Sequence, residues 1–104
     1  MVNDLRSLLL GDVLSPDCRR QLTHWMEANL TGLERLRAHL PSGWRAADKT
    51  GSNGEHTSND IAGLWPPDRR PVFVAAYVTQ CPGPESKRTA MLAEIGRLVV
   101  SHYA

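Results

Sequence analysis

The sequence predicts an α+β fold, in which a three-strand antiparallel meander is flanked by helices. Two observations lead to this prediction. Residues 1–40 and the end of the chain carry apolar side chains at helical spacing, and between them lie short β-rich runs separated by glycine and proline. Because the chain has 104 residues, we expect one domain with one modest core.

The first predicted helix precedes Gly11. Leu5, Leu8 and Leu9 recur at the three-to-four-residue spacing of one helix face. Glycine often ends a helix, because it adopts a left-handed conformation without steric cost, so Gly11 is expected to close this segment.

Two further helical segments are predicted before the strands. Ser15 can cap a helix through its hydroxyl and Pro16 suits the first helical position, so a second helix is expected from there to about Asn29. A short helical segment is expected around residues 33–39 and closes at Pro41, which lacks the backbone N–H that a continuing helix needs.

Three strands are expected in the middle of the chain. Residues 44–49 and 61–65 are short strand candidates, joined by a glycine-bearing stretch that suits a hairpin loop. Residues 66–68, which include two prolines, predict a turn. Residues 72–78 are then continuously apolar and β-rich, which is typical of a central strand covered on both faces.

The last predicted element is a helix. Prolines on both sides of Gly83 are expected to end the last strand before this helix begins. Its apolar stripe is expected to consist of Met91, Leu92, Ile95, Leu98 and Val99.

The cysteines and tryptophans are expected to be buried. Cys18 and Cys81 could form one disulfide, but two unrelated buried thiols are the favoured interpretation. Trp25, Trp44 and Trp65 are expected in or near the core.

Composition and charge exclude several kinds of partner. The formal net charge is +1, whereas nucleic-acid-binding proteins usually show a basic excess on one face, so no nucleic-acid partner is expected. No apolar run approaches the roughly 18 residues that span a bilayer, so no membrane partner is expected. The N-terminal residues lack the basic-then-apolar pattern of a signal peptide, so no export signal is expected in them.

The histidines do not predict a metal site. None of the four stands at the i, i+4 spacing or beside the cysteines that a zinc site requires. Neither a metal nor a cofactor is therefore expected.

Lys49, Thr50 and Gly51 form the most informative motif of the chain. A phosphate-binding loop would need glycine directly before Lys-Thr, but Asp48 stands there. Lys-Thr-Gly on a strand is instead one of three signature motifs of serine β-lactamases and penicillin-binding proteins. Flanking segments extend the match in the same order and spacing: residues 8–12, 14–16, 25–26, 31–32, 35–38, 40–41, 43–44, 48–51, 59–62 and 65–67. Through them the chain resembles the C-terminal part of a class A β-lactamase over nearly its whole length.

The resemblance implies both a fold and a reaction. The fold would be part of the β-lactamase/transpeptidase-like fold, with residues 1–104 as the C-terminal portion of the catalytic domain. The family hydrolyses the β-lactam ring of antibiotics through an acyl-serine intermediate. Neither Ser-x-x-Lys nor Ser-Asp-Asn, the other two signatures, occurs in this chain, and the family's glutamate-bearing loop is absent. The nucleophile is therefore expected to lie outside these residues, and the isolated chain is expected to be inactive.

The resemblance assigns substrate binding to four consecutive residues. Lys49 would place a cation beside the serine and the substrate carboxylate, and Thr50 would offer its hydroxyl to that carboxylate. Gly51 would leave room for a flat bicyclic substrate, and Ser52 would supply a backbone N–H of the oxyanion hole. The alternative for Lys49 is an ordinary solvated lysine at the end of a strand.

Arg35 is the remaining candidate for substrate binding. Some family members carry the carboxylate-binding arginine on the strand after the hairpin, but residues 57–60 contain none. In members of that kind the first arginine of a Thr-Gly-x-x-Arg-x-Arg segment takes this role, and Arg35 matches it; a guanidinium can bind a carboxylate bidentately. Arg35 and Arg37 can equally be ion-pair residues of a helix. Asn53 and His56 depart from the family's usual glycines, which puts the substrate range in doubt.

Two functions of different classes remain open. The first is a β-lactamase-like serine hydrolase, to which this chain contributes the Lys-Thr-Gly strand and which binds β-lactams once the missing part is supplied. The second is a truncated remnant or a complementing partner without activity of its own; a free-standing binding module is a third possibility. Without partner helices the sheet would expose apolar surface, so self-association is expected. Family members are secreted or periplasmic, but this sequence leaves its own location open.

Overall fold

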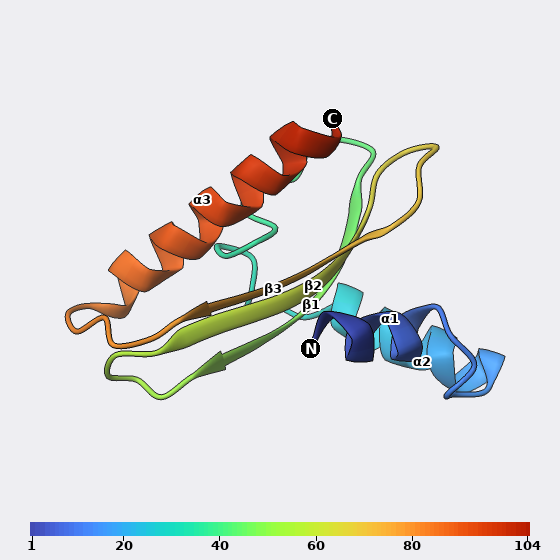
Figure 1. Cartoon of the computed structure of the whole chain (residues 1–104), viewed down its shortest axis with the longest axis horizontal. Coiled ribbons are helices and arrows are strands. Elements are labelled where there is room, and N and C mark those ends of the chain that lie inside the picture. The colour runs from blue at the N-terminus through green and yellow to red at the C-terminus, as the bar shows by residue number, and fades with distance from the viewer.

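The computed structural model describes all 104 residues and contains three helices and three strands (Figure 1). In chain order these are α1 (Val2–Leu9), α2 (Pro16–Glu27), β1 (Arg45–Ser52), β2 (Ser58–Trp65), β3 (Val72–Val78) and α3 (Glu85–Tyr103). The strands form one antiparallel sheet in the order β1-β2-β3. The predicted α+β arrangement is therefore confirmed.

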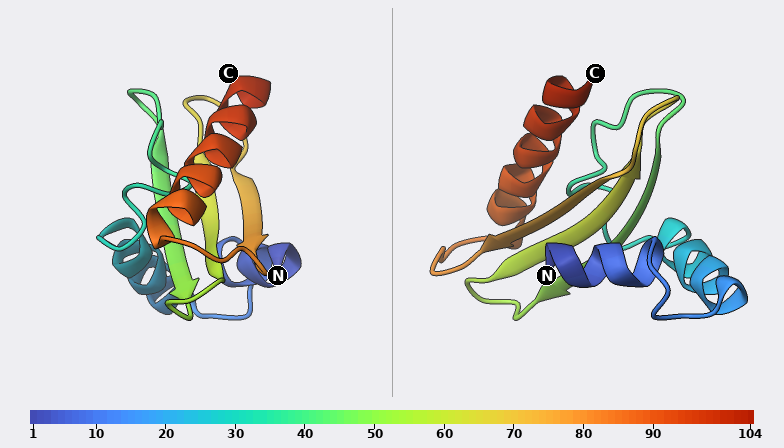
Figure 2. Two further views of the ribbon diagram at one scale, coloured as in Figure 1. Left: turned by 90° about the vertical axis from the view of Figure 1, so that its left-hand side faces the viewer. Right: turned by 45° about the vertical axis from the view of Figure 1, so that its right-hand side comes forward.

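The two faces of the sheet are covered by different helices (Figure 2). α3 packs on one face, and α1 and α2 lie against the other. Because successive strand residues point to opposite faces, the neighbours Ala46 and Ala47 are both buried but belong to separate cores. Ala46 shares its core with Leu92 of α3, whereas Ala47 shares its core with Leu5 of α1. The sheet is thus the layer between two small cores.

The ends of the first two helices agree with their sequence signals. The Ser15 hydroxyl accepts a hydrogen bond from the Cys18 N–H at 3.2 Å, and Pro16 is the first residue of α2. α1 ends at Leu9, and the Gly11 N–H donates back to the carbonyl of Ser7 at 3.1 Å. None of the three helices combines the length and apolarity that crossing a membrane requires.

Residues 31–39, which include the helical segment predicted around residues 33–39, are not a helix, so that prediction is wrong. They form consecutive turns whose backbone hydrogen bonds join residues three apart, as from the Arg35 N–H to the Gly32 carbonyl. Gly32 shows how tightly this turn segment lies against β1, because a Cβ there would be 1.6 Å from Asp48 Oδ2. Contact with the strand, rather than helical propensity, determines this backbone.

The strands differ from their predicted bounds in two ways. β1 continues past residue 49 to Ser52, and β2 begins at Ser58, because the two strands pair over eight residues on either side of a short loop. β3 has the predicted range but lies at an edge of this sheet, which contradicts the prediction of a central strand. Its residues 72–75 are accordingly only half-buried.

The buried face of α3 also differs from the predicted stripe. The buried residues follow one another at intervals of four along much of the helix, as Arg88, Leu92, Gly96 and Val100. Met91 and Leu98, which were expected in the stripe, are 44% and 55% exposed. This face was not predicted because two of its residues, an arginine and a glycine, have no apolar side chain.

Two side chains expected in the core lie at the surface. Trp25 is 65% exposed, and Cys18 is an exposed thiol. Cys81 is half-buried, and neither cysteine forms a disulfide. Trp44 and Trp65 do pack against the two cores, as predicted.

Candidate functional site

The Lys-Thr-Gly motif and Ser52 form the C-terminal half of β1. β1 is an edge strand, so no strand pairs with its outer side. The Lys49 side chain is exposed, and its ammonium donates to the carbonyl of Thr50 at 2.9 Å. Lys49 therefore leaves a charged group at the surface beside the free edge of the strand.

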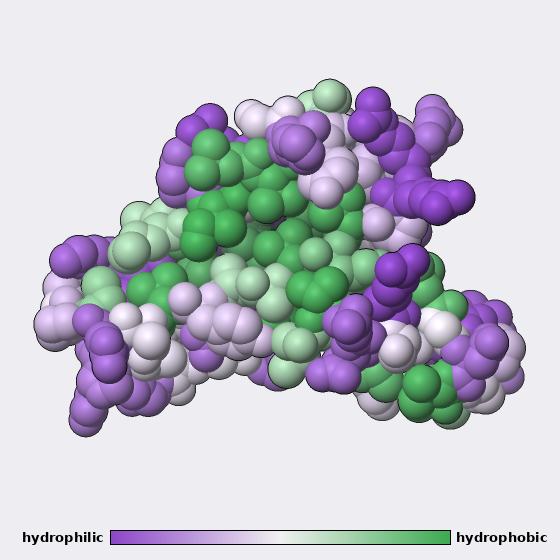
Figure 3. All heavy atoms as spheres, viewed as in Figure 1, coloured by the Kyte–Doolittle hydropathy of each residue, from purple (hydrophilic) through white to green (hydrophobic).

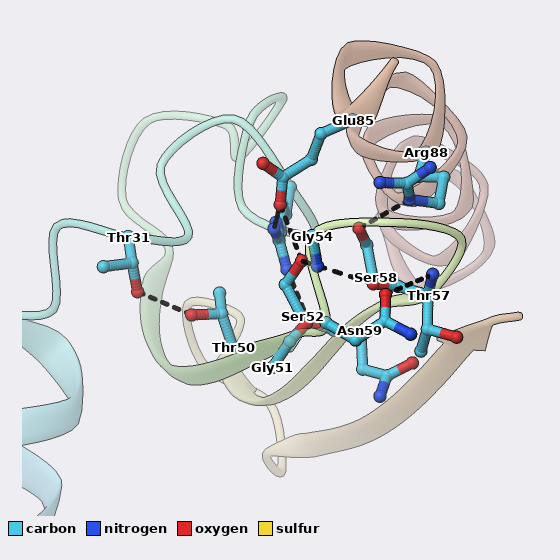
Figure 4. Close-up of polar contacts among 12 residues, drawn as sticks. Thr31, Thr50, Gly51, Ser52, Gly54, Thr57, Ser58, Asn59, Glu85 and Arg88 are labelled. Carbon is cyan, nitrogen blue, oxygen red and sulfur yellow. Dashed lines mark hydrogen bonds and ion pairs between the residues drawn. The ribbon is translucent and has the colours of Figure 1, made fainter. Parts of the chain in front are cut away.

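The hydroxyl of Thr50 is held by a residue of the turn segment (Figure 4). The Oγ1 atoms of Thr50 and Thr31 are 2.7 Å apart, and the Thr31 hydroxyl donates to Asn29 Oδ1 at 2.9 Å. Since a hydroxyl has one proton, Thr50 is then the donor to Thr31. The Thr50 proton can turn from this neutral partner to a ligand without leaving a charged group unpaired.

Arg35 is brought beside the motif strand from the turn segment. Its guanidinium, with 8% of the side chain exposed, donates from Nη1 to the carbonyls of Gly51 and Asn59 at 3.2 and 2.8 Å. Its Nη2 donates to Glu85 Oε1 at 3.0 Å. The sequence-predicted residues Arg35, Gly51 and Ser52 therefore meet at the end of β1.

The hairpin loop next to the site is organised by Asn53. Its Oδ1 accepts hydrogen bonds from the backbone N–H groups of Glu55, His56 and Thr57 at 3.0 to 3.1 Å. Asn53 thus closes the hairpin loop. The His56 ring contacts the hydroxyl of Thr57 and lies in the exposed part of the loop.

Two buried carboxyl groups lie next to the motif. Asp48 and Asp60 have no exposed surface, and the Leu36 N–H donates to Asp60 Oδ2 at 3.1 Å while Arg37 Nη1 donates to Asp48 Oδ1 at 3.4 Å. Burial and the hydrogen bond with Asp48 raise the pKa of the Asp60 carboxyl to about 8. At neutral pH Asp60 is therefore protonated and can share its proton with Asp48, which ties the turn segment to the strand.

Two residues of the site were not found by sequence reasoning. Arg88 is completely buried and donates to Ser58 Oγ and to three backbone carbonyls, which anchors the start of α3 to the hairpin. Its place four residues before Leu92 is a signal that could have revealed it. Glu85, the first residue of α3, accepts from both Ser52 and Arg35, and no pattern in the sequence marks it.

Comparison with known proteins identifies the family. The model of the beta-lactamase enzyme family matches residues 1–103. The beta-lactamase AER-1 of Aeromonas hydrophila is 44% identical over 92% of this chain, and the beta-lactamase CTX-M-25 of Escherichia coli is 41% identical over 99%. These matches cover 32% and 35% of the two relatives, so the chain spans about a third of their length.

Solved structures agree with the sequence relatives. An ancestral class A beta-lactamase (GNCA) superposes with a TM-score of 0.93 at 53% identity, covering 98% of this chain and 39% of that one. A beta-lactamase from Xanthomonas campestris superposes with a TM-score of 0.89 at 48% identity, covering 92% of this chain and 36% of that one. The chain belongs to the beta-lactamase enzyme family, and its relatives are class A members.

Proposed function

We propose that this chain supplies the carboxylate-binding strand of a class A β-lactamase site. The observation that carries the proposal is the meeting of the Ser52 hydroxyl and the Arg35 guanidinium at the end of an edge strand, three residues after the exposed Lys49 ammonium. A cation, a hydroxyl and a guanidinium together suit an anionic group such as the carboxylate of a penicillin.

The glycine of the motif supports a ligand lying along the strand. A Cβ on Gly51 would meet only the side chain of Asn59, at 3.8 Å, which is an ordinary contact distance. Packing within the chain therefore does not require glycine at this position. A flat substrate lying along this face of the strand would require it, because a side chain there would occupy the same space.

In the proposed reaction these residues bind and polarise the substrate. Lys49, Thr50 and Arg35 hold the carboxylate together with the Ser52 hydroxyl. The Ser52 backbone N–H donates to the carbonyl oxygen on which negative charge develops. The attacking serine and its base come from residues outside the 104 present here, since these contain neither Ser-x-x-Lys nor Ser-Asp-Asn. We therefore expect the isolated chain to bind β-lactams without hydrolysing them.

Binding of benzylpenicillin to the ¹⁵N-labelled chain tests this proposal. The amide signals of Thr50, Gly51 and Ser52 are expected to shift on titration, and Lys49→Ala is expected to weaken binding by about tenfold, because a charge-assisted contact is lost. Lys87→Ala, which removes the other lysine of the chain, is the matched control and is expected to leave binding unchanged. Equal affinities of wild type and Lys49→Ala would contradict the assignment.

A chain with no catalytic role of its own is the second candidate. The missing nucleophile motifs favour it. A complementing partner and an inert remnant differ in one respect: only the former would give hydrolysis when the rest of a class A protein is supplied.

A further inference from the structure

The two donors best placed for a substrate carboxylate both bind a carboxylate of the chain itself. Glu85 Oε1 accepts from Ser52 Oγ at 2.8 Å and from Arg35 Nη2 at 3.0 Å. Figure 4 shows the Glu85 side chain reaching from the start of α3 toward Ser52 at the end of β1. One oxygen of Glu85 therefore lies at the point where the two donors converge.

The Ser52 hydroxyl cannot serve Glu85 and a second anion at the same time. The Ser52 hydroxyl has a single proton, and its other acceptor, the Thr57 carbonyl, is neutral and farther away at 3.3 Å. Arg35 Nη1 already donates to two backbone carbonyls, and Nη2 donates one of its two protons to Glu85. A ligand carboxylate that accepts the single proton of Ser52 must therefore take the place of Glu85 Oε1 at that hydroxyl.

Glu85 can be displaced without a large rearrangement. Half of its side chain is exposed, so its carboxylate can return to water. A hollow of about 320 Å³, lined by Thr31, Glu34, Arg35 and Glu85 among others, lies beside the pair. The Arg35 guanidinium keeps its two backbone carbonyls when Glu85 leaves, so the donor stays in place.

We propose that Glu85 is a specificity-determining residue, an internal carboxylate that competes with ligand carboxylates for Ser52 and Arg35. This inference rests on the proposed carboxylate-binding role of the β1 end. The consequence is selectivity between charged and uncharged ligands. A ligand with a carboxylate must displace Glu85 and is repelled by its negative charge, whereas an uncharged analogue neither displaces Glu85 nor is repelled by it.

The test compares benzylpenicillin with its uncharged methyl ester in NMR titrations of the full chain. Glu85→Gln keeps the shape of the side chain and an oxygen for both donors, but it removes the charge. It is expected to tighten benzylpenicillin binding by about tenfold, as the removal of a like charge at close range predicts, and to leave the ester unchanged. Glu34→Gln is the matched control, because Glu34 lines the same hollow but bonds to neither donor.

A second measurement needs no substitution. In the wild-type chain the side-chain carboxyl ¹³C signal of Glu85 is expected to move as benzylpenicillin saturates the site and to stay in place with the ester. One outcome would overturn only the role of Glu85. In it, benzylpenicillin binding depends on Lys49, but Glu85→Gln binds with the affinity of wild type and the Glu85 carboxyl signal does not move. Absence of Lys49-dependent binding in both wild type and Glu85→Gln would overturn the proposed carboxylate site, and this inference with it.

Discussion

Asp48 and Asp60 stand on neighbouring strands, both without exposed surface, and each has one carboxyl oxygen that no other donor reaches, Oδ2 in Asp48 and Oδ1 in Asp60. Two charges would repel in a medium of low dielectric constant, so a proton on Asp60 is favoured. The other oxygens of the two carboxyl groups hold Leu36 and Arg37 of the turn segment, which carries Arg35 to the site. One proton thus supports the geometry of the candidate site.

The first prediction at this scale concerns pH. Because the pKa of Asp60 is about 8 when folded and roughly 4 when unfolded, the folded state binds more protons between these values. Its stability should therefore fall as the pH rises from about 4 to about 8. Asp60→Asn keeps a donor for Asp48 but cannot ionise, so its stability should lack this fall with pH.

Urea unfolding of both proteins across this pH range measures the difference. The two proteins share every other ionisable group, so the difference between their profiles isolates residue 60. The advantage of Asp60→Asn over wild type is expected to grow with pH and to level off above about pH 8. Parallel pH profiles would show that folding does not raise the pKa of Asp60.

At the scale of elements, α3 and the turn segment interlock through backbone contact. Gly96 faces the carbonyl of Leu36 so closely that a Cβ would lie 2.0 Å from its oxygen. Arg88 lies on the same buried face of α3 as Gly96 and joins the start of the helix to the hairpin. The helix therefore positions both Glu85 and the loop after the motif.

The second prediction is that Gly96→Ala destabilises the chain. Alanine favours a helix over glycine by about 1 kcal/mol, so in the absence of this contact the substitution would stabilise. Overpacking against backbone typically costs 1–3 kcal/mol, and we expect a net loss of about that size. Ala90→Gly at an exposed position of α3 calibrates the helix propensity. A Gly96→Ala chain at least as stable as wild type in urea would refute the close contact.

Sequence alone predicted those elements whose signals are local. The Ser15–Pro16 cap and the apolar run of β3 depend on neighbouring residues, and both were predicted at their observed positions. The turn segment was wrongly predicted as a helix. Its backbone is determined by contact between Gly32 and Asp48, which are distant in the chain, and a local sequence pattern does not reveal such a contact.

In the candidate site, too, the residues marked by a local pattern were predicted and the others were missed. The motif on β1 was recognised as consecutive residues, and Arg35 was predicted from a segment pattern of the family. Glu85 was missed because its role depends on α3 folding back to the end of β1, fifty positions from Arg35. A lone glutamate at the start of a helix has no distinguishing mark in the sequence.

At the scale of the whole molecule, apolar surface remains uncovered. Figure 3 shows apolar side chains gathered over α3 and the strand next to it. Met91, Leu98 and Tyr77 are among the exposed side chains, and a hollow of about 680 Å³ lies between α1, the start of β3 and Tyr103. Self-association through this surface stays a prediction.

The central claim is that the β1 end serves the β-lactam chemistry of the family while the nucleophile comes from other residues. Its most direct test is nitrocefin hydrolysis by this chain co-produced with the part of a class A relative that carries Ser-x-x-Lys and Ser-Asp-Asn. Co-purification of the two pieces first establishes that they assemble.

We predict hydrolysis by the assembled pieces and none by either piece alone. Lys49→Ala should reduce the rate by about a hundredfold or more, the effect typical of losing a charge-stabilising group, and Lys87→Ala should leave it unchanged. Hydrolysis by the pure chain, an assembled complex without activity, or an assembled Lys49→Ala complex with full activity would contradict the account.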